Sequence, residues 1–209
     1  MIRPLDARFV TTAVAPEGYP GGGTPEIAFV GRSNVGKSSM INAIAGRRKL
    51  VRVSHTPGRT RTLNFFDVDL EVDGERRTLR LADLPGYGFA RVQKKERATW
   101  ERMITTYLAG RRELRGVVSI VDAEVGPTQD DMRTLRYLAE IGRPALVVAT
   151  KLDRLPKARR RPRLRAIAEA LRVNPHQVLG FSATEKQGLT AVCQALWELS
   201  DRASTVVDP

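Results

Sequence analysis

The sequence predicts an α/β protein in which helices cover both faces of an open, mainly parallel sheet. Short apolar runs rich in β-branched residues alternate along the chain with stretches whose apolar residues recur at helical spacing. The runs lack the apolar–polar alternation of half-exposed strands, as expected for parallel strands that are buried on both faces. The chain has 209 residues, 42% hydrophobic and 28% charged, which suits one globular domain rather than a disordered chain.

The expected elements follow one another in a regular order, with a helical pattern at Met40–Ala45 after the first strand. We expect six strands, at residues 26–30, 62–72, 78–82, 116–121, 145–150 and 178–182. Further helices are indicated by apolar stripes within residues 100–108, 132–138, 164–171 and 189–197. The pair Asp73-Gly74 predicts a two-residue hairpin turn, so one strand should be antiparallel at an edge of the sheet.

The ends of the chain have a different character from its middle. Residues 1–23 are expected to form an N-terminal extension packed on the main domain, with a short extended piece at Phe9–Val14. The main domain is expected to span 24–203, and residues 204–209 to form a disordered tail. The lone cysteine, Cys193, excludes a disulfide framework and indicates a reducing compartment. With no signal peptide and no apolar run of membrane-spanning length, we expect a soluble, cytoplasmic protein.

The segment after the first expected strand fits G-x-x-x-x-G-K-[ST], the phosphate-binding loop of many nucleotide-binding proteins. Its glycines allow backbone N–H groups to turn toward a polyphosphate, and the following helix begins with the dipole end that favours an anion. Lys37 is expected to contact the β- and γ-phosphates, and the Ser38 hydroxyl to bind Mg²⁺. The candidate nucleotide-binding residues of this loop are Gly31, Arg32, Ser33, Asn34, Val35, Gly36, Lys37 and Ser38.

Two later motifs identify the base. Thr150-Lys151-Leu152-Asp153 ends a strand, and an aspartate there can accept two hydrogen bonds from guanine, which adenine cannot offer. The aliphatic stem of Lys151 can cover the base. Phe181-Ser182-Ala183 ends the last strand, where backbone N–H groups could meet guanine O6. Because ligands of open α/β sheets bind at the carboxyl ends of the strands, these segments predict a guanine-nucleotide site.

A third motif lies between the phosphate loop and the base motifs. Asp83-Leu84-Pro85-Gly86 reads as D-x-x-G at the end of a strand. The Asp83 carboxylate can reach Mg²⁺ through a bridging water, and the Gly86 N–H can meet a γ-phosphate.

Together these motifs resemble the EngB (YihA/YsxC) family of bacterial GTPases, in the TrmE-Era-EngA-YihA-septin superfamily. The resemblance is carried by GRSNVGKSSMINAI, HTPGRTRTLNFF, DLPGYGFA, TKLD and FSA, and it extends over nearly the whole chain. It implies a three-layer P-loop GTPase fold and a role in assembly of the large ribosomal subunit. It also implies a link to normal cell division and septation.

The resemblance also implies a first switch whose residues bind GTP, at Gly58, Arg59, Thr60, Arg61 and Thr62. Thr60 is the implied Mg²⁺ ligand, although Thr62 is chemically as able and only the alignment with TPGRT favours Thr60. Asn34 suggests K⁺ beside the phosphates, because some related G proteins use such an asparagine for that ion. We treat K⁺ dependence as a hypothesis.

Hydrolysis is expected to be slow, because Tyr87 stands where Ras-like proteins carry the glutamine that orients the attacking water. A partner or a monovalent cation would then complete the site. Arg59, Arg61 and Arg91 lie near the switches, but no catalytic residue can be chosen among them from the sequence.

The charge of the chain predicts a polyanionic partner. There are 35 Lys plus Arg against 23 Asp plus Glu, a net charge of +12, which exceeds what a nucleotide and Mg²⁺ require. Basic runs without many acids lie at 46–62, 91–97 and 154–165, and two of them flank the expected switches. We expect binding to rRNA phosphates and large-subunit particles, by a monomer without stable membrane association. A P-loop nucleotide kinase or ATPase and a membrane-associated GTPase are the alternatives.

Overall fold

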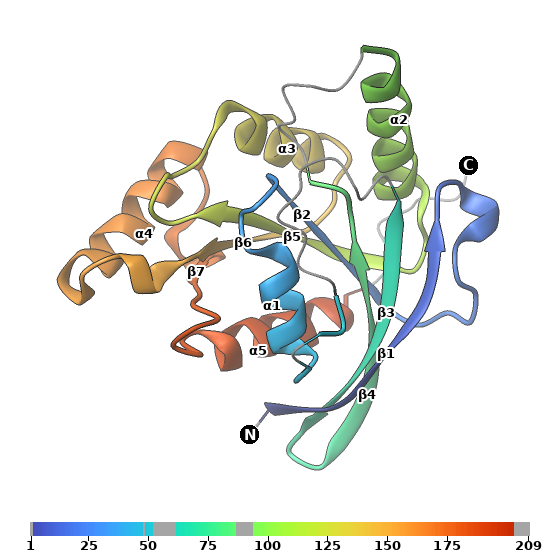
Figure 1. Ribbon diagram of the computed structural model, residues 1–209, viewed down its shortest axis with the longest axis horizontal. Coiled ribbons are helices and arrows are strands. Elements are labelled where there is room, and N and C mark those ends of the chain that lie inside the picture. Colours follow the sequence, from blue (N-terminus) through green and yellow to red (C-terminus); the bar gives the residue numbers. More distant parts are fainter. Residues whose placement is uncertain (1, 48, 52–61, 87–93, 203–209) are drawn as a thin grey trace.

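The computed structural model describes residues 2–47, 49–51, 62–86 and 94–202, and for 94–100 it describes the backbone helix alone. These residues form a seven-stranded sheet in the order β1-β3-β4-β2-β5-β6-β7 (Figure 1). The strands are β1 (Ile2–Ala13), β2 (Glu26–Gly31), β3 (Leu63–Val72), β4 (Glu75–Asp83), β5 (Leu114–Asp122), β6 (Ala145–Thr150) and β7 (Val178–Gly180). Strands β2, β4, β5, β6 and β7 pair in parallel, so the predicted fold class is confirmed.

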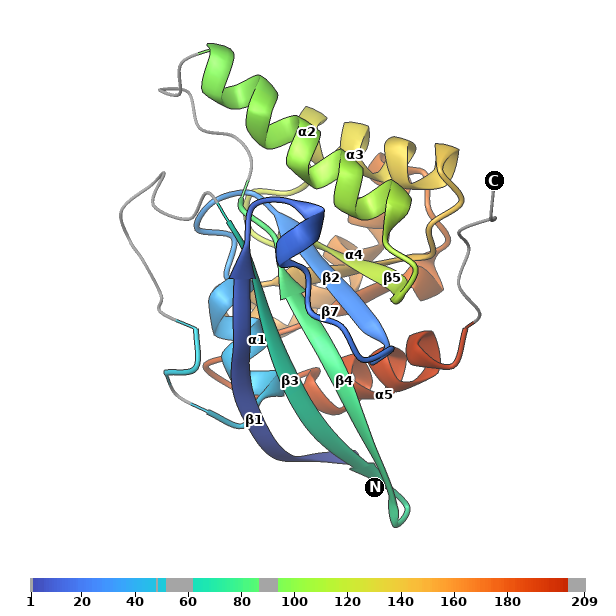
Figure 2. The ribbon, with the colours of Figure 1, turned by 90° about the vertical axis from the view of Figure 1, so that its right-hand side faces the viewer.

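Helices cover both faces of this sheet, as Figures 1 and 2 show. The helices are α1 (Lys37–Ile44), α2 (Lys94–Gly110), α3 (Gln129–Glu140), α4 (Lys157–Leu171) and α5 (Leu189–Ser200). The apolar residues of α1 and α5 belong to one buried cluster, and those of α2, α3 and α4 to a second cluster on the other face. Short 3-10 turns are η1 (Pro16–Gly18), η2 (Leu152–Arg154) and η3 (Pro175–Gln177).

The predicted hairpin connects β3 to β4. Asp73 and Gly74 both have positive φ, 50° and 89°, and Val72 pairs with Glu75 directly across the turn. Positive φ at both central positions is the conformation of the tight turn that Asp-Gly favours. Strand β3 is antiparallel to β4, but it does not form the edge of the sheet.

The edge strand is β1, so the sheet has seven strands where the sequence predicted six. The short extended piece expected at Phe9–Val14 lies, except for Val14, within a strand of 12 residues that pairs with β3. Two register shifts interrupt this pairing, between Pro4 and Asp6 and between Phe9 and Thr11. Each shift changes which side chains face the core, so β1 shows neither continuous apolarity nor alternation in its sequence.

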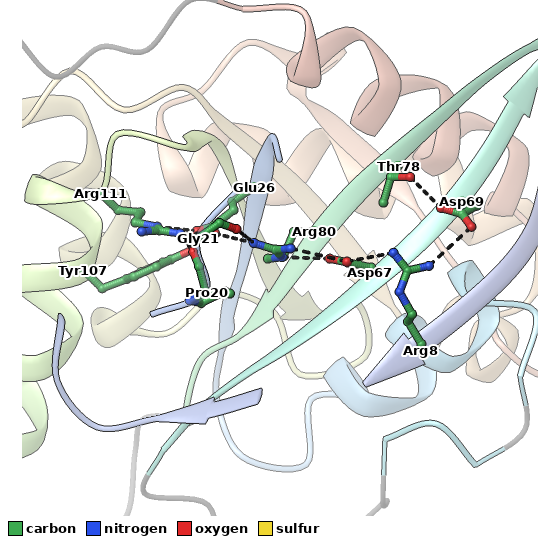
Figure 3. Close-up of polar contacts among 10 residues, drawn as sticks. All are labelled: Arg8, Pro20, Gly21, Glu26, Asp67, Asp69, Thr78, Arg80, Tyr107 and Arg111. Carbon is green, nitrogen blue, oxygen red and sulfur yellow. Dashed lines mark hydrogen bonds and ion pairs between the residues drawn. The ribbon is translucent and has the colours of Figure 1, made fainter. Parts of the chain in front are cut away.

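A chain of buried ionic contacts runs from the start of β2 across β4 to β3 (Figure 3). Glu26 is fully buried and accepts hydrogen bonds from Tyr107 Oη at 2.8 Å and from Arg111 Nη2 at 2.6 Å, both on the α2 side. Arg80 lies 3.8 Å from Glu26 and donates from Nε to Asp67 at 2.7 Å. Burial, and after it the Glu26 carboxylate, raises the pKa of Tyr107 well above its usual value.

The contacts continue to the edge strand. Arg8 of β1 donates to Asp67 at 3.0 Å and lies 3.6 Å from Asp69, whose other oxygen accepts the Thr78 hydroxyl at 2.7 Å (Figure 3). Charged and polar side chains therefore connect α2, β2, β4, β3 and β1. Among the described residues, no helix is both long and apolar enough to cross a membrane.

Candidate nucleotide-binding site

The described motif segments all follow the carboxyl ends of parallel strands. The phosphate loop follows β2, the D-x-x-G segment follows β4, and the two base motifs follow β6 and β7. Because β2 pairs with β4 on one side and with β5 on the other, the motifs are distributed along one edge of the sheet. This is the edge at which open α/β sheets bind ligands.

The phosphate loop has the backbone conformation that its glycines permit. Gly36 has φ 98° and immediately precedes α1, and Asn34 has φ 62°. A Cβ atom at Gly31 would lie 2.8 Å from the carbonyl oxygen of Ile120, closer than real contacts allow. Glycine is thus required at Gly31 by the close approach of β5, and at Gly36 by the left-handed turn into the helix.

The phosphate loop and the D-x-x-G segment meet through charged and backbone contacts. Lys37 forms an ion pair with Asp83, and the two side chains are only 11% and 4% exposed. The backbone of Gly86 lies against the loop, since a Cβ atom there would be 3.0 Å from the Ser33 nitrogen. The Leu84 N–H donates to the Phe29 carbonyl at 3.1 Å, which extends the pairing of β4 with β2. The structure therefore brings the two predicted phosphate motifs together.

Thr150 connects the base side of the site to the phosphate loop. Its hydroxyl lies 2.5 Å from the carbonyl oxygen of Val35 and 3.1 Å from that of Val121, and the residue is 2% exposed. A Cβ atom at Gly36 would lie 3.5 Å from the same hydroxyl oxygen. The T-K-x-D pattern predicts nucleotide binding at Thr150, and the structure adds that the Thr150 side chain supports the phosphate loop.

The two base motifs are also in direct contact. The Ser182 hydroxyl donates to Oδ1 of Asp153 at 2.6 Å and accepts the backbone N–H of Glu185 at 3.0 Å. Leu152 N–H donates to the Phe181 carbonyl at 3.2 Å, while Phe181 itself is 1% exposed. The sequence predicts a role only for backbone N–H groups in this segment, and the contact by which the Ser182 side chain holds Asp153 was missed.

Lys151 occupies a left-handed conformation, with φ 57°, at the start of η2. Its ammonium donates to Oδ2 of Asp122 at 2.6 Å, while Oδ1 accepts N–H groups of Glu124 at 2.9 Å and Val125 at 3.2 Å. Burial raises the pKa of Asp122, but these hydrogen bonds and the Lys151 charge outweigh burial and lower it overall. Asp122 was not among the predicted site residues. The sequence shows only that it is an acidic residue directly after an apolar run.

Several predicted residues lie outside the described part of the chain. These are Gly58, Arg59, Thr60 and Arg61 of the expected first switch, together with Tyr87 and Arg91. Thr62 is described, half-buried and directly before β3, and Ala183 is exposed after Ser182. No statement about the geometry of the first switch follows from the described residues.

The described oxygen donors at this edge suit a magnesium ion held mainly by a ligand's phosphates. Ser38 is the second residue of α1, and the Asp83 carboxylate lies beside Lys37. Within the described ranges, no group of three or more His, Cys, Asp or Glu side chains could hold a metal on its own. Mg²⁺ commonly keeps several waters and takes few protein ligands when it binds substrate phosphates, so this donor set fits it.

The family model and the curated relatives that match this chain all describe GTP-binding proteins. A family model described as "50S ribosome-binding GTPase" matches residues 26–151. A Myxococcus xanthus protein, "Probable GTP-binding protein EngB", is 62% identical over 206 residues, covering 99% of this chain and 100% of that protein. The protein of the same name from Bacillus subtilis is 42% identical over 197 residues, covering 94% and 97% of the two chains.

Solved structures agree at the level of the fold. The crystal structure of a probable GTP-binding protein engB is 23% identical, with a TM-score of 0.63, and covers 84% of this chain and 98% of that one. A point variant of Aquifex aeolicus Era, bound to GDP and AlF4-, is 20% identical with a TM-score of 0.68. The match covers 89% of this chain and 62% of the Era chain. The chain therefore has the fold of these GTP-binding domains.

Proposed function

The chain belongs to the EngB family of GTP-binding proteins, and we propose that it is a GTP-driven switch that binds GTP and GDP at the carboxyl edge of its sheet. The observation that carries the proposal is the contact between Ser182 and Asp153, because it holds the guanine-reading carboxylate in place. The proposed contacts to the nucleotide are those of the four motifs and of the 58–62 segment. Competition of GDP and ADP against a fluorescent guanine nucleotide tests it, since equal displacement would favour a kinase or ATPase.

For the metal, we propose that Ser38 and Thr60 would hold Mg²⁺ directly and Asp83 through water. When bound, the ion offsets the charge that develops on the phosphates during hydrolysis. Lys37 would then contact the β- and γ-phosphates. For this contact, its ammonium must either bind Asp83 and the phosphates together or move away from Asp83. A Lys37→Met variant should lose affinity for both GTP and GDP, and its free energy of unfolding should also fall, because Asp83 loses its buried partner.

We propose slow intrinsic hydrolysis because Tyr87 cannot orient a water as glutamine does. The Asn34 side chain is the proposed K⁺ contact, a hypothesis that rests on its place in the phosphate loop. Single-turnover GTP hydrolysis in KCl and in NaCl tests it, and identical rates in the two salts would refute K⁺ dependence. No catalytic side chain is proposed.

The proposed partner is the assembling large ribosomal subunit, in the cytoplasm, with cell division and septation affected when assembly fails. The name of the matching family model and the net charge of +12 support this partner. In the basic run at 154–165, three arginines are used within the fold. Arg154 pairs with Glu124 at 3.0 Å, Arg160 is buried, and Arg163 donates to the Ala123 carbonyl at 2.6 Å.

The remaining basic residues of that run are exposed on α4, and they are Lys157, Arg159, Arg161 and Arg165. With charges four residues apart, Arg161 and Arg165 lie on neighbouring turns of the helix and can meet successive phosphates of a nucleic acid. By contrast, Arg47 in the first basic run is paired with Asp6. We therefore propose α4 as one contact with rRNA.

Cosedimentation with large-subunit particles tests the partner. Binding should differ between the protein with GDP and the protein with a non-hydrolysable GTP analogue. The logarithm of the association constant should fall linearly with the logarithm of salt concentration. The double variant Arg161→Glu with Arg165→Glu should weaken binding to the particles. The double variant Arg133→Glu with Arg136→Glu makes the same charge change on α3 and serves as the control, so it should weaken binding less. Equal binding in both nucleotide states would refute the switch, and flotation with anionic vesicles instead would favour a membrane-associated GTPase.

A further inference from the structure

Arg160 differs from the other basic residues of α4 because its side chain points into the protein. The residue is 9% exposed, in a run whose nearest basic neighbours, Arg159 and Arg161, are exposed. Its Nε donates to the Leu155 carbonyl at 3.1 Å. Leu155 ends the short segment that begins with the predicted base motif at Thr150, so the guanidinium supports the loop that carries Asp153.

The same guanidinium also contacts the loop that follows β7. Nη1 and Nη2 donate to the two carboxylate oxygens of Glu185 at 2.7 and 3.1 Å, and Nη1 donates to Oε1 of Gln187 at 2.6 Å. A two-pronged contact of this kind fixes the orientation of both partners, which a lysine ammonium cannot do. One side chain therefore binds the two loops that carry the predicted base motifs.

The contacts continue from Glu185 to the guanine-reading carboxylate. The Glu185 N–H donates to the Ser182 hydroxyl, which in turn donates to Asp153. The loop is closed by a hydrogen bond from Ser182 N–H to the Gln187 carbonyl at 3.0 Å. Arg160 is thus three contacts away from Asp153, and it holds the segment from which Ser182 positions that carboxylate.

We propose that Arg160 is a positioning residue for guanine recognition, which keeps the two base-binding loops in the relative position that favours guanine over adenine. This inference rests on the proposed function of the site. The hydrogen bond from Arg160 lowers the pKa of Glu185, so the carboxylate is ionised at neutral pH and the pair is present there. Loss of the guanidinium would leave the Glu185 and Gln187 side chains without this partner and free the loop to move away from Asp153.

The test measures GDP and ADP affinities of Arg160→Met, which keeps most of the aliphatic stem but removes the donors. We expect GDP affinity to fall about tenfold, which is the effect of losing one charged hydrogen-bonding partner, while ADP affinity stays unchanged. The exposed neighbour supplies the matched control, and Arg161→Met should leave both affinities unchanged. Equal losses for GDP and ADP, or no loss, would overturn the proposal.

Glu185→Gln provides a second variant, because its partly exposed side chain, 42%, tolerates the change without risk to the core. It should lower GDP affinity about threefold and leave ADP affinity unchanged, since it removes the charge but not the shape. Unaltered GDP affinity in this variant would also overturn the proposal. A wild-type protein that does not prefer GDP to ADP would instead refute the proposed function of the site itself.

Discussion

The Ser182 hydroxyl donates a hydrogen bond of 2.6 Å to the Asp153 carboxylate, across 29 residues of sequence. Ser182 is fully buried, and its oxygen also accepts the Glu185 N–H, so the hydroxyl has a single orientation available for Asp153. The carboxylate that is proposed to read guanine is consequently held by the other base motif.

Ser182→Ala should therefore weaken guanine-nucleotide binding. With the hydroxyl removed, Asp153 can rotate and Glu185 N–H loses its acceptor, so we expect GDP affinity to fall about threefold to tenfold. Titration calorimetry with GDP measures this directly. Thr184→Ala, at an exposed position of the same loop, serves as the control. Wild-type affinity in Ser182→Ala would mean that Asp153 does not depend on this contact.

Thr150→Val should destabilise the protein by about 1–3 kcal/mol, because the buried carbonyl of Val35 loses its donor while the shape of the side chain is kept. Urea denaturation at pH 7 gives the change in the free energy of unfolding. The same substitution at Thr190, an exposed position of α5, should change it by less than about 0.5 kcal/mol. Comparable effects at both sites would contradict a role for the Thr150 hydroxyl.

Two glycines with positive φ differ in the space around them. At Gly188, with φ 80°, a Cβ atom would overlap the Gly180 carbonyl oxygen, whereas at Gly142, with φ 68°, nothing lies within 4 Å. Gly142→Ala should cost only the backbone strain, about 1 kcal/mol. Gly188→Ala should lower the free energy of unfolding by several times that amount, because the backbone on both sides must shift. Thermal denaturation of both variants compares the two, and equal losses would contradict this account.

Those parts of the candidate site that depend on local chemistry could be predicted from the sequence. Gly36 and Lys37 have fixed spacing within one loop, and Asp73-Gly74 determines its own turn, so each could be recognised without knowledge of distant residues. The same holds for Asp153 at the end of a clearly apolar strand. These predictions concern residues whose expected roles depend on their immediate neighbours in the chain.

The contacts that were missed join residues far apart in sequence. Asp122 meets Lys151 29 residues later, and Arg160 meets Glu185 after 25 residues, and neither pair leaves a pattern within one segment. Arg160 was counted within the basic run at 154–165 that was expected to bind rRNA, because helical periodicity cannot distinguish a buried arginine whose partners lie in another loop. The β1 strand was underestimated for a related reason, since its register shifts remove the alternation by which strands are recognised.

Glu26→Gln tests the ionic contacts that join five elements across the sheet. Glu26 is fully buried between Arg111 and Arg80, and the change removes the carboxylate charge that these two arginines share. Breaking a buried pair in this way is expected to lower the free energy of unfolding by about 3 kcal/mol. Urea denaturation measures it, and Glu71→Gln, which removes the partner of the mostly exposed Arg3, should have a much smaller effect. A small effect at Glu26 would mean that water or rearrangement replaces the lost charge.

Cys193 should be inert in the folded protein. It is 2% exposed within the apolar cluster beside α5, and burial raises the pKa of its thiol from 9.0 to about 11. Because only the thiolate reacts, the ionised fraction at pH 8 falls from about a tenth to about a thousandth, on top of the steric protection. Reaction with a chromogenic disulfide at pH 8 should thus be slow in native buffer and rapid in denaturant, which provides the internal control. Stoichiometric labelling of the native protein within seconds would show that α5 opens readily and that the cluster around Cys193 is not closed to solvent.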